Sequence, residues 1–218
     1  MAVNFFRRTG MKRSKVFLIV FFAFTAMTVF AEKATVDSVC MSLSSHKVTT
    51  GSFVQEKTNG KSSRVLKSNG TFILSQDGVG LSTIKPLKTF QGITQTSVIK
   101  TTPDGSRSVI DVSNNQMYKS ISQIVISLFN GDKSELEKNF TIQFDASDTN
   151  WQMLLTPKDK TIASSVGTIT LGGSSSGMIS FDTLIIDNAS GGKVSYTFSE
   201  QKYKEVLSDA EKALFARK

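Results

Sequence analysis

The sequence Gly51-Ser-Phe-Val-Gln-Glu-Lys57, followed by a polar turn and then by Arg64-Val-Leu-Lys-Ser-Asn-Gly-Thr-Phe-Ile-Leu-Ser75, predicts the fold most directly. Side chains of a strand alternate between two faces, so Phe72 shares one face with Leu74. The segment between the two runs is rich in glycine and polar residues, as hairpin turns are. We therefore expect an antiparallel hairpin with one apolar face and one solvent-exposed face.

The same alternation continues through the rest of the chain. Short strands with turn residues between them are expected at 78–86, 95–101, 108–112 and 116–118. The strongest alternation predicts five further strands, at 140–144, 151–155, 167–171, 178–187 and 193–198. Large apolar side chains occupy one face of this set, and Thr, Ser, Gln and Asp dominate the other. Such a sheet must bury its apolar face against another layer.

Three helical segments are predicted, and they are short. An amphipathic helix is expected within residues 35–47, an insert between the strands within 120–139, and a last helix at 209–215. The insert carries a stripe of large apolar residues with helical spacing, and it ends at Asn130-Gly131. These helices could hardly cover some ten strands. We therefore expect a mainly β fold with some α, in which a single antiparallel sheet curls into an unclosed half β-barrel with a short helical lid.

The first 31 residues have the pattern of a secretory signal peptide. A basic segment, Met11-Lys-Arg-Ser-Lys15, precedes an apolar run of 15 residues and a small residue, Ala31. A membrane anchor is the alternative, but a span needs roughly 20 apolar residues. We expect cleavage after Ala31, which leaves 32–218 as one domain in the periplasm.

Charge and cysteine content limit the possible functions of residues 32–218. Residues 1–31 contain five of the cations and no acidic residue, so the net charge of +8 falls to +3 for the remainder. This value and the scattered charges give no sign of nucleic-acid binding. The single cysteine, Cys40, excludes an internal disulfide. We interpret Cys40 as a residue on one face of the first helix, and lipidation remains the alternative.

The sequence offers little for catalysis. The one histidine, His46, lies six residues after Cys40, so on a helix the two side chains would point about 240° apart. A serine triad would also need a histidine in the right place. No group of residues has the spacing of metal ligands, and the loop Gly172-Gly-Ser-Ser-Ser-Gly177 lacks the features of a phosphate cradle. We therefore expect no enzymatic activity, no metal site and no cofactor.

A series of segments carries a resemblance to a known family. The first helix runs into 51–57, and then come 68–75, a strand ending in Lys85-Pro86, the insert ending in Leu128-Phe-Asn-Gly-Asp132, and the segments 136–140, 151–158 and 169–173. In this order they resemble the outer-membrane lipoprotein carrier family of Gram-negative periplasms, the LolA-like proteins, over residues 35–200. The similarity is to the divergent branch with Gly-Asp after the insert, in which some members serve acyl or glycolipid export.

The resemblance implies a periplasmic carrier, or chaperone, that moves lipoproteins from the inner to the outer membrane. Acyl chains released by an inner-membrane ABC transporter would enter a hydrophobic cavity under a helical lid and pass to an outer-membrane receptor. A chain of roughly 16 carbons represents about 13 kcal/mol of transfer free energy, at about 0.8 kcal/mol per buried CH₂. Such a carrier should therefore bury its cargo only in part. We expect it to act as a monomer.

The resemblance and the apolar pattern together give candidate site residues. The acyl-chain cavity is expected to involve Phe53, Phe72, Leu74, Leu81, Ile84, Phe90, Phe140, Phe144, Trp151 and Phe181. The lid is expected to contribute Ile121, Ile124, Leu128 and Phe129. The family often holds its lid with an arginine at the position of Lys85, and many members have tryptophan at that of Leu81. Lys85 is therefore a candidate latch that keeps the charge but lacks the planar fork of donors. For each apolar residue, plain core packing is the alternative.

Other functions stay open at this stage. One is export of a glycolipid or another acyl lipid, and a second is an envelope assembly module whose open sheet edge pairs with partner strands. The third is a hydrolase with an unusual site.

Overall fold

The computed structural model describes residues 33–216, so the predicted signal peptide at 1–31 lies outside the described residues. The described residues belong to one compact unit, Glu32–Lys218. Its strands are β1 (Val48–Thr58), β2 (Leu66–Ser75), β3 (Gly78–Lys85), β4 (Thr89–Thr94), β5 (Ser97–Thr101), β6 (Arg107–Asp111), β7 (Phe140–Ala146), β8 (Asn150–Pro157), β9 (Val166–Ser174), β10 (Thr183–Asn188) and β11 (Lys193–Lys204).

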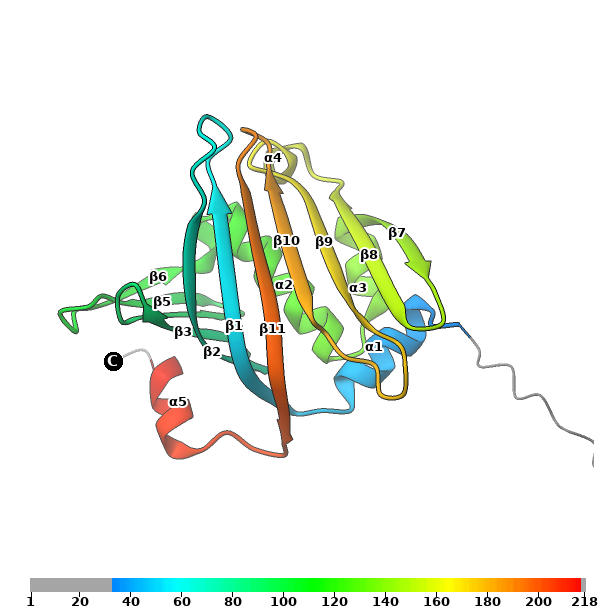
Figure 1. The fold of residues 1–218 in the computed structure, drawn as a ribbon, viewed down its shortest axis with the longest axis horizontal. Coiled ribbons are helices and arrows are strands. Elements are labelled where there is room, and N and C mark those ends of the chain that lie inside the picture. Colours follow the sequence, from blue (N-terminus) through cyan, green and yellow to red (C-terminus); the bar gives the residue numbers. More distant parts are fainter. Residues whose placement is uncertain (1–32, 217–218) are drawn as a thin grey trace, which may run out of the picture. The chain divides into compact units, whose positions relative to one another are not determined.

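All eleven strands form one antiparallel sheet, in the order β6-β5-β4-β3-β2-β1-β11-β10-β9-β8-β7 (Figure 1). Because β6 and β7 are its two edges, the sheet is unclosed, as the sequence predicts. The expected hairpin is β1–β2, in which Val48 pairs with Ser75 at one end and Lys57 with Leu66 at the other. The long strand β11 pairs with the other side of β1 and so joins the two halves of the chain.

The helices are short and few, and most of them cover one face of the sheet. They are α1 (Val36–Ser44), α2 (Gln116–Phe129), α3 (Lys133–Asn139), α4 (Lys160–Ala163) and α5 (Asp209–Phe215), with a 3₁₀ turn at Val112–Asn114. Figure 1 shows α1, α2 and α3 together behind the sheet, and α5 apart from them. Helix α2 contacts α1, α3, α4 and the strands β2, β3 and β4. None of the helices within residues 33–216 has the length and apolar character needed to span a membrane.

The main hydrophobic core lies between the sheet and the helices α1 to α4. It includes Val39 and Leu43 from α1, Leu128 from α2, and Met153 and Ile169 from the sheet. Each of these side chains is almost completely buried. Burial of apolar surface contributes about 25 cal/mol per Å² to the stability of the fold, and this layer buries most of that surface. No disulfide adds to it, because Cys40 is the single cysteine.

The opposite face of the sheet carries a smaller core under α5. Phe215 packs edge-on against Phe90, with ring centroids 5.9 Å apart. Gly80 and Gly92 pair across β3 and β4, and a Cβ on Gly80 would lie 2.9 Å from the Phe215 ring. Arg107 donates a hydrogen bond of 2.7 Å to the carbonyl oxygen of Leu214 and fixes the end of α5. The two glycines thus provide the space that the aromatic side chain occupies.

The structure corrects several predicted elements. Residues 116–118, expected as a strand, begin α2, because the Asn115 side chain accepts a hydrogen bond from the amide of Tyr118 and caps the helix. Strand β4 was not predicted. The strand expected at 178–187 begins only at Thr183. Residues before it form a loop, in which Ser180 accepts a hydrogen bond of 3.0 Å from the indole nitrogen of Trp151.

Candidate functional site

An apolar cavity of about 40 Å³ lies between α2 and the covered face of the sheet. It is lined by Leu74, Val79, Leu81, Gln91, Ile93, Ile121, Phe181, Leu184, Ile186, Tyr196 and Phe198. The lining comes from β2, β3, β4, β10 and β11, from the loop before β10, and from α2. Gln91 and Tyr196 are its only polar side chains, so the cavity is suited to an apolar ligand.

Helix α2 forms the roof of this cavity. Its apolar stripe is buried at Ile124, Leu128 and Phe129, and Ile121 reaches the cavity itself. The hydroxyl of Ser122 donates a hydrogen bond of 2.9 Å to the carbonyl oxygen of Thr94 at the end of β4. The roof is therefore attached by apolar contacts and by a hydrogen bond to the end of one strand.

A chain of polar side chains borders the cavity toward the β1–β2 hairpin. The Gln55 amide nitrogen donates to the Tyr196 hydroxyl at 2.6 Å, and the Ser68 hydroxyl donates to the Gln55 carbonyl oxygen at 2.7 Å. Burial raises the pKa of Tyr196 to about 12, so its hydroxyl is neutral at physiological pH. These three side chains satisfy one another's hydrogen-bonding groups at the polar end of the covered face.

The structure brings some of the predicted site residues together at the cavity. Leu74, Leu81 and Phe181 line it, as does Ile121 of the predicted lid. Other predicted residues are buried in the surrounding core, namely Phe53, Phe72, Phe140, Trp151, Ile124, Leu128 and Phe129. Phe144 is half-buried and stacks on Trp151 with ring centroids 6.5 Å apart.

Three predicted residues lie elsewhere. Phe90 points to the opposite face, where it contacts Phe215. Ile84 is 50% exposed. Lys85 is also exposed and pairs with Asn69 in the β2–β3 ladder, and its role as a latch stays a prediction.

Several cavity residues were not named from the sequence. Gln91 and Ile93 belong to β4, the strand that was not predicted. Leu184 and Ile186 alternate along β10, and Tyr196 and Phe198 alternate along β11. Tyr196 and Phe198 belong to the predicted strand 193–198, but their distance from the cavity depends on the pairing of strands far apart in the sequence.

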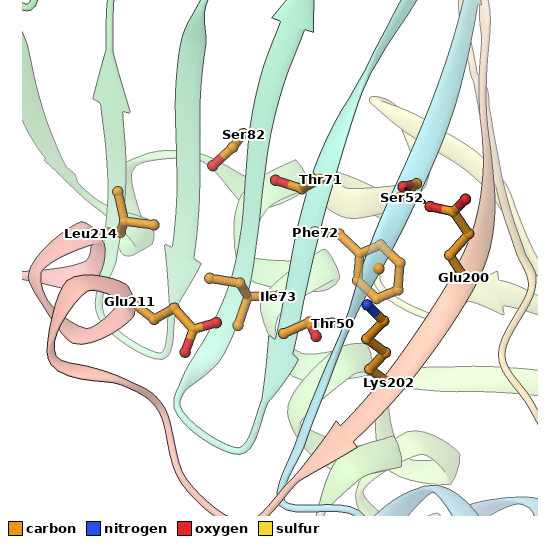
Figure 2. A pocket seen from close by; sticks show the side chains of 11 residues that line it. Thr50, Ser52, Thr71, Phe72, Ile73, Ser82, Glu200, Lys202, Glu211 and Leu214 are labelled. Atoms are coloured by element: carbon orange, nitrogen blue, oxygen red, sulfur yellow. Dashed lines mark hydrogen bonds between the residues drawn. The ribbon is translucent and has the colours of Figure 1, made fainter.

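A larger hollow of about 640 Å³ lies on the other face of the sheet (Figure 2). Its walls include Glu200, Lys202 and Glu211, together with Thr and Ser side chains of β1, β2 and β3. Figure 2 shows these polar side chains around it and Leu214 of α5 at one side. The hydroxyl of Ser52 donates a hydrogen bond of 2.6 Å to Glu200. Phe72, Ile73 and Leu214 also line this open hollow, but its charged side chains make it poorly suited to an acyl chain.

Other chemistry is sparse within residues 33–216. No group of three or more His, Cys, Asp and Glu side chains in this part of the chain could hold a metal ion. Cys40 of α1 is buried in the main core, and burial raises the pKa of its thiol to about 11. His46 stacks on Tyr203, with ring centroids 3.9 Å apart, so its ring is engaged in packing.

The sequence of this open sheet with its helix over an apolar interior is similar to that of one known family. Residues 97–188 match a family model described as "Outer membrane lipoprotein carrier protein LolA-like". The matched residues run from β5 to β10 and include the roof helix, and over this range the chain is similar to that family. The resemblance predicted from the sequence is confirmed. A search of curated proteins gave no significant match.

Solved structures of low sequence identity resemble this fold. A DUF1329 family protein from Desulfovibrio piger is 11% identical, with a TM-score of 0.49, over 82% of this chain and 96% of that one. A LolA superfamily protein from Nitrosomonas europaea is 8% identical, with a TM-score of 0.42, over 82% and 97%. Lipoprotein LppX of Mycobacterium tuberculosis is 11% identical, with a TM-score of 0.44, over 78% and 93%.

Proposed function

We propose that the protein is a periplasmic carrier that binds the acyl chains of lipoproteins in the apolar interior beneath α2 and moves them from the inner to the outer membrane. The observation that carries the proposal is the apolar cavity between the sheet and a roof helix. In this role residues 1–31 direct export and residues 32–218 form the carrier domain. The role is one of binding, and its partners are an inner-membrane ABC transporter and an outer-membrane receptor.

The size of the cavity supports a carrier whose roof moves. A volume of about 40 Å³ accommodates little more than a single small molecule such as water. An acyl chain can enter only if α2 shifts and its buried residues, such as Leu128 and Phe129, leave the sheet. The acyl chain then replaces apolar contacts that the protein made with itself. This exchange keeps the net affinity well below the full transfer free energy of the chain, as release requires.

Binding of a fluorescent fatty-acyl probe, with native mass spectrometry of the protein purified from its own cells, tests the proposal. Ile121 and Ile126 make a matched pair, because both lie on α2 and are half-buried, but only Ile121 lines the cavity. We expect Ile121→Asn to weaken probe binding by at least tenfold and Ile126→Asn to leave it within about twofold, since a polar group in an apolar site costs about 1–3 kcal/mol. Equal affinities in the two variants, or no binding by the natural protein, would contradict the proposal.

The mass of a bound adduct identifies the cargo. An acylated peptide would support lipoprotein transport, whereas a glycolipid or free acyl chain would support the alternative of lipid export. In both cases the cargo binds in the same cavity, and only the identity of the cargo differs.

One observation favours a second function, strand pairing in envelope assembly. The edge strand β6 leaves Val109 and Ile110 41% and 37% exposed, and an unpaired edge can accept a partner strand. Val109→Pro would remove a backbone donor from this edge, because Val109 lies between the residues of β6 that bond to β5. If the protein acts by strand pairing, this variant loses partner capture while its probe binding stays unchanged.

A further inference from the structure

Two neighbouring segments at one end of the sheet combine positive charge with exposed apolar side chains. We define them as the basic margin, residues 57–67 of the β1–β2 hairpin and residues 84–88 of the β3–β4 turn. They contain no Asp or Glu, and their cations are Lys57, Lys61, Arg64, Lys67, Lys85 and Lys88. The chain beyond Ala31 has a net charge of +3, so without these six cations its charge would be −3. The positive charge of the domain is therefore concentrated here.

The strand register places the two segments next to each other. Lys57 pairs with Leu66 at the open end of the hairpin, and Asn69, three residues further along β2, is the partner of Lys85. The turn after β3 therefore begins beside the first residues of β2. Figure 1 shows the β1–β2 hairpin extending beyond the neighbouring strands.

The apolar side chains of the basic margin are unusually exposed. Val65, Leu66, Ile84 and Leu87 are 43%, 53%, 50% and 61% exposed. Single exposed apolar residues are common, but these four alternate with cations along two short segments. In contrast, the exposed Met41 and Val206 lie on α1 and next to α5.

Most of the cations are available to a partner. Lys67 forms an ion pair of 2.6 Å with Glu56 just outside the margin. Among the described residues, Glu56 is the only carboxylate that pairs with any of the six cations. Lys61, Arg64, Lys85 and Lys88 are exposed and free of such pairs. A partner with dense negative charge and an apolar layer just beneath it would match this surface.

We propose that the basic margin docks on the surface of an anionic lipid bilayer. Lys and Arg side chains are attracted to anionic headgroups, while Leu66 and Leu87 insert at the boundary between headgroups and acyl chains. A single type of contact would be weak, and the combination of the two gives specific, reversible attachment.

The margin adjoins the polar side chains that border the cavity. Lys57 lies two residues after Gln55 on β1, and Leu66 lies two residues before Ser68 on β2. Both therefore share the inward face on which Gln55 meets Tyr196. Docking at the margin would therefore turn the polar end of the covered face toward the membrane. The proposal goes beyond carrier function, because it concerns attachment of the protein to lipid and not the occupancy of its cavity.

Flotation with lipid vesicles tests the proposal. The purified protein is mixed with vesicles of phosphatidylglycerol and phosphatidylethanolamine, or with vesicles of phosphatidylcholine alone. We expect binding to the anionic vesicles that declines as salt is raised, and at least tenfold weaker binding to the neutral ones. The triple variant Lys61→Gln, Arg64→Gln, Lys88→Gln should bind the anionic vesicles on the order of a hundredfold more weakly, at about fivefold for each cation removed.

A second variant tests the apolar contribution, and matched variants control for it. Leu66→Ser with Leu87→Ser should weaken binding at high salt, where the charge contribution is screened. The controls are Lys33→Gln with Lys202→Gln, and Met41→Ser with Val206→Ser, which change exposed residues outside the margin. We expect both controls to bind vesicles as the natural protein does.

Several outcomes would overturn the proposal. They are equal binding to neutral and anionic vesicles, no vesicle binding by the natural protein, and unchanged binding by the triple variant. The proposal would also be overturned if the natural protein bound an acidic partner protein but no vesicles, and the triple variant lost binding to that partner. The margin would then be a protein-binding surface. Probe binding in the cavity is measured separately, so loss of docking with retained probe binding distinguishes this surface from the carrier site.

Discussion

The amide nitrogen of Gln55 donates a hydrogen bond of 2.6 Å to the hydroxyl of Tyr196, although the two residues are 141 positions apart in the sequence. They face each other across β1 and β11, the strands that join the two ends of the domain. Ser68 extends this contact to β2. The polar chain thus fixes three adjacent strands at the border of the cavity.

Tyr196→Phe should lower the free energy of unfolding by about 1 kcal/mol, because it leaves a half-buried Gln55 donor without its partner. In a domain of this size the melting temperature should fall by about 3 °C. Denaturant unfolding measures the change. Tyr203→Phe is the control, since its hydroxyl makes only a long contact of 3.5 Å with Gln201. An equal loss in both variants would show that the Gln55 contact is not the cause.

Stability should decline in alkali as Tyr196 ionises. Burial raises the pKa of Tyr196 from 10.0 to about 12, so its neutral form stabilises the fold fully below pH 10. This contribution, about 3 kcal/mol at most, is lost as pH rises from about 10 to about 12. Unfolding experiments across this range should show a smaller decline for Tyr196→Phe. Cys40→Ala separates the similar effect of the buried thiol, whose pKa is raised from 9.0 to about 11. Identical pH profiles for the natural protein and Tyr196→Phe would contradict this prediction.

Local patterns in the sequence were enough to predict the β1–β2 hairpin and the buried stripe of α2. The alternation around Phe72 and the helical spacing of Leu128 and Phe129 each report on contacts with a single layer. The unclosed antiparallel sheet followed from the same evidence, because few helices were available to cover many strands.

The composition of the cavity wall could not be predicted in this way. Phe90 has the apolar character of a cavity residue, but the register of β3 with β4 turns it toward Phe215 on α5. Strand β4 contains Gly92 and few large apolar residues, so it gave little local signal. A one-residue shift exchanges the faces of a strand, and that register is set by pairing with distant segments.

Gly80→Val should detach α5 from the sheet. The new side chain would enter the space of the Phe215 ring, because a Cβ alone would lie 2.9 Å from it. We expect faster hydrogen exchange and faster proteolysis at 209–215, with a loss of about 1–2 kcal/mol in the free energy of unfolding. Phe215→Ala should have the same effect, whereas Lys212→Ala on the exposed side of α5 should not. Unchanged protection of α5 in Gly80→Val would mean that the glycine pair does not position the helix.

Ser122→Ala should make the roof of the cavity open more easily. The variant removes the hydrogen bond of 2.9 Å to the Thr94 carbonyl, and an alanine at this buried position still supports the helix. We expect a loss of about 1 kcal/mol in stability, and association of the fatty-acyl probe about three- to fivefold faster. Stopped-flow fluorescence measures the association rate, and Ser45→Ala at the end of α1 is the control. If α2 must move for the probe to enter, the rate rises only in Ser122→Ala. If the probe enters by another path, the two variants associate at the same rate as the natural protein, and α2 is then not the gate.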